Sequence, residues 1–141
     1  MKRRFVLDAW AVLALLQGEE PAASRVKELL DLALKGEVHM SLSIINLGEV
    51  IYWVGKVKGE NEAARTLEEI RRLPLTVVSA SDEVVFAAVS FKIRHAISHA
   101  DAFAAATGQQ LDAVLVTGDP ELLELDEIIA LERLHRAAVA E

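Results

Sequence analysis

The chain has 141 residues, of which 52% are hydrophobic and 26% are charged, and its formal net charge is −7. This length fits one domain with a single core, and this composition excludes a disordered or fibrous chain. The absence of cysteine excludes disulfides and thiolate metal sites and fits a reducing cytosol, and the acidic balance means that any nucleic-acid contact needs a local basic patch.

Short β-rich segments alternate with longer helical patterns, which is typical of a parallel sheet covered by helices. In chain order, the patterns predict strand 4–8, helices 9–17 and 22–35, strand 38–41, helices 43–57 and 60–72, strand 75–79, helices 81–94 and 99–107, strand 113–117, a helical turn after Pro120 and a weaker strand 127–131. Breaks are predicted at Gly36, Gly59, Pro74 and Gly108. We therefore expect a single α/β domain over residues 1–141, a three-layer α/β/α sandwich with a parallel sheet of about five strands.

Two features argue against export and against a membrane span. The basic start at residues 2–4 is followed by only three apolar residues before Asp8, which is too short for a signal peptide. Glu49 and Asp101 interrupt the two longest apolar stretches. We expect a soluble, cytoplasmic protein.

The helix predicted from Ser43 to Val57 is apolar on nearly every side, and Glu49 is its only charge before Lys56. Such a helix lies beneath other elements or contributes to a subunit interface. Burying an ionised carboxylate without a partner costs several kcal/mol. Glu49 is therefore either a partly exposed residue or a residue whose charge is balanced by a cation.

Three further carboxylates occur among apolar residues. Asp8 and Asp119 each follow a predicted strand, at the edge of a parallel sheet where ligands bind. Asp101 lies in the apolar segment 96–106. Each has a structural alternative, because Asp8 and Asp119 could cap helices and Ser98 with Asp101 has the spacing of a capping box.

Four carboxylates that meet in one place repel one another unless a cation compensates them. Oxygen ligands suit Mg²⁺ and Mn²⁺, which keep bound waters and engage phosphates. A site of this kind activates water and neutralises the charge that develops on a phosphoryl group. The pattern therefore indicates hydrolysis of phosphodiesters.

Four segments together resemble the PIN domain, and more narrowly the VapC-type toxins of prokaryotic toxin–antitoxin pairs. They are FVLDA at residues 5–9, IINLGEV at 44–50, SHADA at 98–102 and VLVTGD at 114–119. The resemblance spans essentially the whole chain. It implies a parallel sheet between helices and an endoribonuclease that depends on Mg²⁺ or Mn²⁺. It also implies an RNA substrate, a cognate antitoxin at the active cleft and a homodimer.

Carried over residue by residue, the resemblance makes Asp8 and Asp101 the principal metal ligands, completed by Glu49 and Asp119 directly or through water. Thr117 would supply a supporting hydroxyl, and Asn46 would line the cleft. The chain departs from the family shortly after its first aspartate. The family commonly has Ser or Thr one or two positions later, where this chain has Ala9 and Trp10.

Two other functions are consistent with parts of the sequence. A phosphoaspartate protein would use Asp8 as a nucleophile, but Trp10 stands where a second acidic residue is expected. A PIN-like module that only binds protein would use Trp10 for association. For RNA, the candidate phosphate contacts are the basic pairs at 56 and 58, 71 and 72, and 92 and 94, and the sequence does not identify which RNA is bound.

Overall fold

The computed structural model describes residues 2–137. At its centre lies a five-stranded sheet in the order β3-β2-β1-β4-β5, in which every neighbouring pair is parallel. The strands are β1 (Arg3–Leu7), β2 (Val38–Ser43), β3 (Thr76–Val78), β4 (Val114–Thr117) and β5 (Leu131–Arg133). The helices are α1 (Ala9–Gln17), α2 (Ala22–Leu34), α3 (Ile44–Lys58), α4 (Glu60–Arg71), α5 (Asp82–Arg94), α6 (His99–Gln110) and α7 (Pro120–Leu123).

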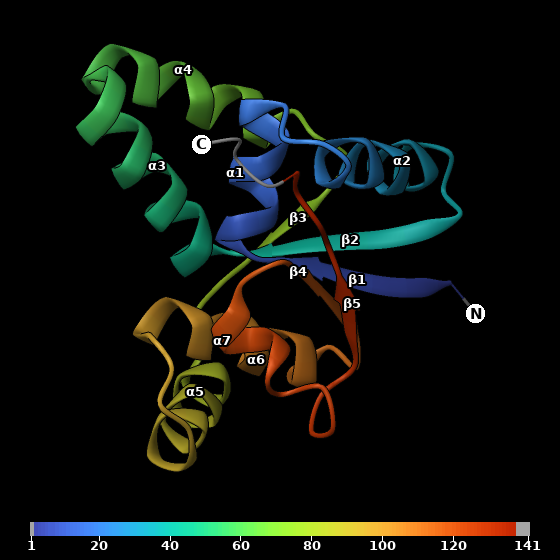
Figure 1. The fold of residues 1–141 in the computed structure, drawn as a ribbon, viewed down its shortest axis with the longest axis vertical. Coiled ribbons are helices and arrows are strands. Elements are labelled where there is room, and N and C mark those ends of the chain that lie inside the picture. The colour runs from blue at the N-terminus through green and yellow to red at the C-terminus, as the bar shows by residue number, and fades with distance from the viewer. Residues whose placement is uncertain (1, 138–141) are drawn as a thin grey trace.

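The sheet lies between two groups of helices, α1 to α4 on one face and α5 to α7 on the other (Figure 1). Successive strand residues point to opposite faces. Phe5 and Leu7 of β1 therefore pack in the core with α1 to α4, whereas Val6 packs in the core with α5 to α7. All three are fully buried, as expected for a parallel sheet covered on both sides. The predicted three-layer architecture is confirmed.

Helix α3 is buried on one side only, so of the two alternatives for it, burial beneath other elements holds for one face, and a part in a subunit interface stays a prediction for the other. Leu47, Val50 and Val54 are buried against the core, whereas Tyr52 and Val57 are exposed. The helix begins where the Ser43 side chain accepts a hydrogen bond from the backbone N–H of Ile45 at 3.2 Å. One packed face is enough to hold an amphipathic helix, so its other apolar residues reach solvent.

Two predicted boundaries are wrong. The last strand covers Leu131–Arg133 and not 127–131, because backbone hydrogen bonds from Ile128 and Ile129 to the Leu125 carbonyl hold that segment in turns. Helix α6 continues through Gly108 to Gln110. Gly108 has no left-handed backbone conformation, and a Cβ there would make only ordinary contacts at 3.7 Å with the Ala113 carbonyl oxygen and the Leu115 side chain, so the helix passes through this glycine and does not end at it.

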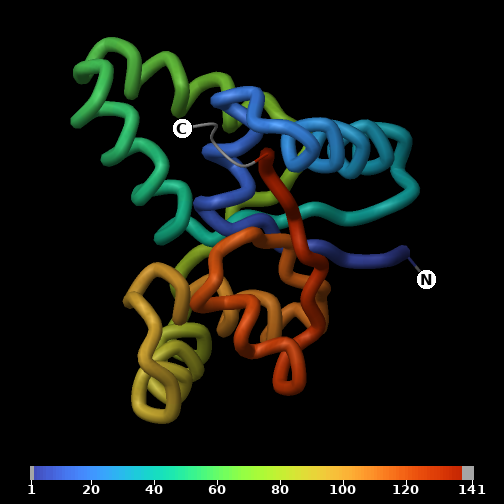
Figure 2. Tube along the Cα trace, viewed as in Figure 1, coloured from blue at the N-terminus to red at the C-terminus, as the bar shows by residue number. Residues whose placement is uncertain are grey.

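After β5 the chain crosses to the loop between α1 and α2 (Figure 2). The Ala22 N–H donates to the His135 carbonyl at 2.8 Å, and the Ala137 N–H donates to the Glu20 carbonyl at 2.9 Å. Arg136 thereby comes close to the first turn of α1. Among the described helices, none is long and apolar enough to cross a membrane.

Candidate metal centre

The sheet brings two of the predicted carboxylates together. Strands β1 and β4 are parallel neighbours, with Leu7 opposite Val116. Asp8 and Asp119 follow these two strands, so both lie at the same carboxyl edge of the sheet. The expectation that the two aspartates end adjacent strands is confirmed.

Asp8 is only 1% exposed, and both of its carboxylate oxygens are hydrogen-bonded. Oδ1 accepts from the Ala11 N–H at 2.8 Å and so caps α1, and Oδ2 accepts from the Thr117 hydroxyl. Burial, and to a lesser extent the charge of Asp119, raise the pKa of Asp8 to about 7 against the lowering effect of these bonds. The capping alternative is therefore realised by this residue, which also lies near enough to Asp119 to be affected by its charge.

Thr117 connects Asp8 to Asp119. Its hydroxyl donates to Asp8 and accepts from the backbone N–H of Asp119 at 3.0 Å. The Asp119 carboxylate in turn accepts from the Glu121 N–H at 2.9 Å, which caps α7 ahead of Pro120 at its first position. This chain of bonds fixes the orientation of both aspartates, and Thr117 has the supporting contact predicted for it.

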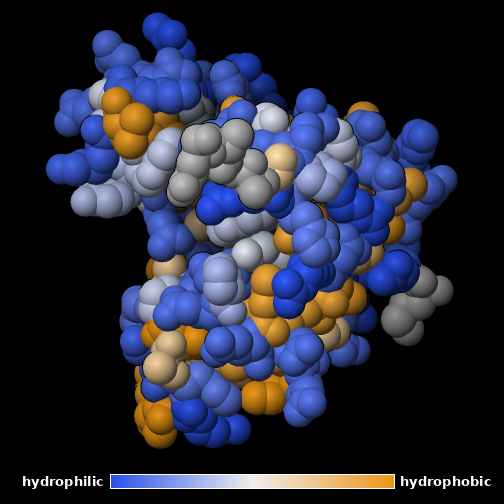
Figure 3. All heavy atoms as spheres, in the orientation of Figure 1, coloured by the Kyte–Doolittle hydropathy of each residue, from blue (hydrophilic) through white to orange (hydrophobic). Residues whose placement is uncertain are grey.

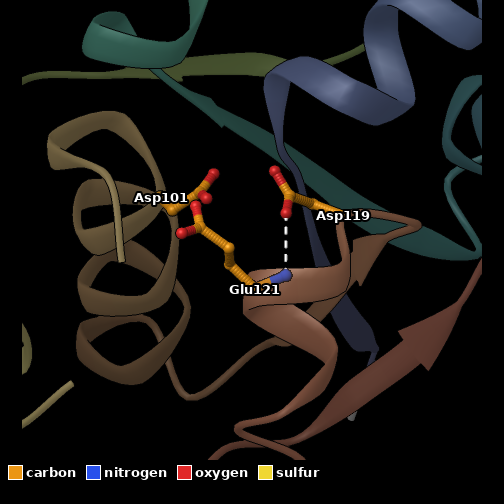
Figure 4. A group of neighbouring side chains, drawn as sticks. All are labelled: Asp101, Asp119 and Glu121. Atoms are coloured by element: carbon orange, nitrogen blue, oxygen red, sulfur yellow. Dashed lines mark hydrogen bonds between the residues drawn. The ribbon is translucent and has the colours of Figure 1, made fainter. Parts of the chain in front are cut away.

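Asp101 approaches from the opposite side, in the first turn of α6 (Figure 4). Ser98 caps this helix by accepting from the Asp101 N–H at 3.1 Å. Asp101 is 6% exposed, and its buried Oδ2 has no hydrogen-bond partner among the described residues. Burial, together with the charge of Asp119 and a hydrogen bond shared with the Glu121 carboxyl, raises the pKa of Asp101 to about 8.

Glu49 and Asn46 come from α3, one helical turn apart. Glu49 is exposed, yet partial burial of its carboxyl group and the charge of Asp119 raise its pKa. Asn46 is buried, and its Nδ2 donates to the Ala100 carbonyl at 3.0 Å. This bond ties α3 to the start of α6. Asn46 therefore holds the two acidic helices together, while its Oδ1 has no partner among the described residues.

The tightest acidic group consists of Asp101, Asp119 and Glu121, whose ligand oxygens lie within 4.8 Å of one another (Figure 4). Asp8 and Glu49 lie outside this group, although the charge of Asp119 acts on both of them. Sequence reasoning missed Glu121, because an acidic residue in the first turn of a helix is ordinary. Its position two residues after Asp119 was the available signal.

This arrangement fits a hard divalent cation. The donors are carboxylate oxygens only, as Mg²⁺ and Mn²⁺ prefer. The Asp101 oxygen without a partner among the described residues is a ready ligand atom, and the charges of Asp119 and Asp8 raise the proton affinity of Asp101. Carboxylates alone would repel a phosphate, so a phosphate could approach these donors only through a bound cation.

A comparison with protein-family models gives one match, to the PIN domain, over residues 5–128. The chain belongs to the PIN domain family. The match spans both aspartate-bearing strands, α3 and α6, so every predicted site residue of this PIN domain lies inside it. A sequence search of curated proteins gives no match.

Solved structures with this PIN fold include chains of toxin–antitoxin complexes. One is from DNA-bound VapBC of Salmonella typhimurium (TM-score 0.73, 19% identity, covering 94% of this chain and 98% of that one). Another is from promoter-bound VapBC2 of Rickettsia felis (TM-score 0.71, 19% identity, 94% and 99%). A third is VapC20 of Mycobacterium tuberculosis, described as a toxin that cleaves the sarcin–ricin loop (TM-score 0.66, 18% identity, 85% and 93%). At these identities the likeness establishes the fold.

In this PIN domain Trp10 covers the loop that carries Asp119. A Cβ at Gly118 would lie 2.4 to 2.6 Å from three ring atoms of Trp10, so only glycine allows the indole to rest on the loop. On the ring lies Arg136, with its guanidinium carbon 5.4 Å from the ring centroid. The indole at this departure from the family pattern is thus packed into the structure beside the acidic group.

Proposed function

We propose that this PIN domain is an endoribonuclease that requires Mg²⁺ or Mn²⁺ and acts as the toxin of a type II toxin–antitoxin pair in the cytoplasm. The observation that carries the proposal is the convergence of Asp101, Asp119 and Glu121, whose ligand oxygens lie within 4.8 Å of one another. Burial raises the pKa of Asp8, Glu49 and Asp101, and the charge of Asp119 adds to the rise in each of them. A protein has little reason to gather these carboxylates in an apolar setting unless a cation joins them.

We assign Asp101, Asp119 and Glu121 as the direct ligands, with Asp8 and Glu49 completing the negative site. A bound divalent cation would supply an activated water and neutralise charge on the phosphate that is attacked. The protein's own part is positioning. Thr117 fixes the orientation of Asp8 and Asp119, and the bond from Asn46 to the start of α6 keeps Asp101 facing them.

The descriptions of three neighbouring structures support the proposed toxin function. VapC20 of Mycobacterium tuberculosis is described as cleaving the sarcin–ricin loop. VapBC of Salmonella typhimurium and VapBC2 of Rickettsia felis were crystallised as complexes bound to DNA. By this likeness we propose an RNA substrate and a cognate antitoxin for the present chain.

The test is cleavage of a panel of tRNA, rRNA and mRNA by the full chain with Mg²⁺ or Mn²⁺, and with EDTA. We expect cleavage that EDTA abolishes and that Asp101→Asn lowers by at least about 100-fold, the scale of losing one charged group at a reacting centre. Asp31→Asn is the matched control, because Asp31 is exposed on α2 away from the site. Cleavage that persists in EDTA, or that Asp101→Asn leaves unchanged, refutes the proposal.

A homodimer is proposed on the exposed face of α5. Three apolar side chains at helical spacing are open to solvent there, Phe86 at 71%, Val89 at 44% and Ile93 at 79%. Apolar surface gathers at this end of the molecule, where α5 lies (Figure 3). Glu83 and Arg94 lie near the two ends of α5 on one flank of this stripe. In an antiparallel pair about a two-fold axis, each Glu83 meets Arg94 of the second copy, so the face is self-complementary in charge.

Dimerisation is tested by sedimentation of wild type, Phe86→Glu and Leu34→Glu. Leu34 is the control, because it is 75% exposed on α2 and apart from the α5 stripe. We expect a dimer for wild type and Leu34→Glu and a monomer for Phe86→Glu. A wild-type monomer at tens of micromolar, or a Phe86→Glu dimer, refutes the α5 interface.

The phosphoaspartate alternative is disfavoured by the surroundings of Asp8. A nucleophilic aspartate has to present a free oxygen to the phosphodonor, whereas Asp8 is 1% exposed and hydrogen-bonded at both oxygens. A purely protein-binding role predicts that the acidic group binds no cation. Calorimetry with Mn²⁺ separates that role from the nuclease.

A further inference from the structure

A hollow of about 420 Å³ opens beside the acidic group and takes no part in the site described above. It begins at the Asp119 loop, since Gly118 and Pro120 on either side of that residue both line it. The aromatic and basic side of the hollow is formed by Trp10, Arg133, His135 and Arg136. A hollow of this size lies within the range of about 300–1,000 Å³ found for small-molecule sites, so one nucleotide fits it.

The basic wall of the hollow is unusual in so acidic a chain. Arg133 is exposed and forms no ion pair with any residue in the described range 2–137. Arg136 pairs with Glu19 at 3.2 Å, but its side chain is 58% exposed and keeps donors free. Glu124 is the acidic residue of the lining. Because Glu19 already pairs with Arg136, Arg133 is the arginine of this wall whose charge has no acidic partner within residues 2–137.

The sheet positions Arg133. It ends β5, where it is paired in register with Thr117 of β4, and Thr117 is the residue that orients Asp8 and Asp119. A phosphate held by Arg133 would therefore lie close to the edge where the acidic group is built. Arg133 and the acidic group thus lie near the same edge of the sheet.

Trp10 supplies the aromatic surface. Its ring packs against the core and contacts Gly118, and the Arg136 guanidinium over it is held by this ring contact and by an ion pair with Glu19, while the Arg136 side chain is 58% exposed. Unpaired bases stack on aromatic rings and on guanidinium planes, whereas bases within a duplex are not free to do so. A rigid indole with a movable guanidinium beside an arginine is a combination that suits a nucleobase and its phosphate.

We propose that this hollow binds one unpaired nucleotide of the RNA substrate next to the bond that is cut, with its base held by Trp10 and Arg136 and its phosphate by Arg133. The proposal rests on the proposed nuclease function and adds to it the residues of this chain that hold a nucleotide beside the acidic group. A segment of a partner protein is the competing occupant. The arginines and the adjacent acidic group, which we propose cleaves phosphodiesters, favour RNA over a protein segment.

Binding is measured without cleavage, on full-length protein carrying Asp101→Asn in EDTA, with a labelled 12-nucleotide single-stranded RNA of mixed sequence. Trp53→Phe is added so that Trp10 reports alone. We expect RNA to quench its fluorescence and Trp10→Ala to weaken binding roughly tenfold, with Trp10→Phe close to the parent. Arg133→Gln should lower the salt dependence of binding by about one phosphate contact.

The matched control is Arg65→Gln, which removes the same charge from an exposed position on α4 and should leave both readouts unchanged. If Trp10→Ala does not fold, the salt dependence of RNA binding by Arg133→Gln tests the proposal alone. The proposal is overturned if RNA does not quench Trp10 fluorescence and both Trp10→Ala and Arg133→Gln bind RNA with the parent's affinity. It is also overturned if the protein binds an RNA duplex as tightly as the single strand. It is likewise overturned if Trp10→Ala weakens binding of the protein encoded beside this chain while RNA binding stays the same.

The two proposals fail in different ways. If wild type with Mn²⁺ cleaves no RNA, the nuclease function fails, whatever the hollow binds. If wild type cleaves RNA and the Trp10→Ala and Arg133→Gln variants cleave it with unchanged kcat/KM, the nucleotide site alone fails.

Discussion

Replacing Asp101 by Asn should stabilise the metal-free protein, although it removes a residue from the site. Burial and its acidic neighbours raise the pKa of this carboxyl to about 8 from its usual 3.8. The folded state therefore binds the proton more tightly than the unfolded state does. The contribution of Asp101 to the free energy of unfolding is then greatest at low pH and falls as the pH rises from about 4 through 8. At pH 7 the loss from this one carboxyl amounts to about 4 kcal/mol.

Asn resembles the protonated acid and carries no charge, so the variant avoids this loss in part. Its amide must still be hydrogen-bonded in a buried place, and the other carboxylates remain. We expect a gain of about 1–2 kcal/mol, which is a rise of roughly 2–8 °C in Tm for a domain of this size. The assay is thermal unfolding in EDTA between pH 5 and 8.5, where the curve of Tm against pH should be flatter for Asp101→Asn.

Asp31→Asn again serves as the control, because it removes an exposed charge from α2 and should change neither Tm nor its pH dependence. The reasoning is refuted if Asp101→Asn melts at or below the wild-type temperature throughout this range. It is also refuted if the metal-free wild type becomes more stable as the pH rises from 5 to 8.

Three further predictions concern the Asp119 loop. Thr117→Val removes the hydroxyl between two aspartates and should lower stability by about 1–3 kcal/mol in urea unfolding; an unchanged midpoint would contradict the role of that hydroxyl. Gly118→Ala places a Cβ 2.4 to 2.6 Å from the Trp10 ring and should destabilise the fold, while Trp10→Ala in the same chain should restore part of the loss; additive effects would count against that contact. Glu121→Gln should weaken Mn²⁺ binding in calorimetry by about tenfold, whereas equal affinity would remove this residue from the ligand set.

The sequence is sufficient to predict the layered fold because its strands and helices carry separate signals. The strand predicted at 4–8 from its apolar run at 5–7, and the helix predicted at 22–35 from its periodicity, match β1 and α2 to within a residue. The last strand was misplaced because a run of apolar residues at 128–131 fits a strand as well as a turn. Backbone hydrogen bonds to Leu125 and pairing with β4 decide between the two, and neither is written in a local pattern.

Part of the candidate site can also be predicted from the sequence. Asp8 and Asp119 could be placed together because each ends a strand, and the order of parallel strands makes them neighbours. The wall formed by Arg133 and Arg136 could not, because these residues approach the loop only through tertiary packing. Glu121 is local, two residues after Asp119, but an acidic residue in the first turn of a helix is ordinary and does not by itself indicate a ligand. The capping and metal-binding interpretations of Asp119 were posed as alternatives, yet the same side chain caps α7 and faces Asp101.

The most direct test of the central claim is calorimetric titration of Mn²⁺ into the metal-free protein at pH 7, repeated in buffers of different ionisation enthalpy. Because the pKa values of Asp8 and Asp101 are raised to about 7 and about 8, binding a cation to this site must expel protons. We expect binding with proton release that fades by pH 9, and we expect Asp101→Asn to abolish or greatly weaken it. No binding, or binding without proton release that Asp101→Asn leaves intact, would contradict a metal centre at this edge of the sheet.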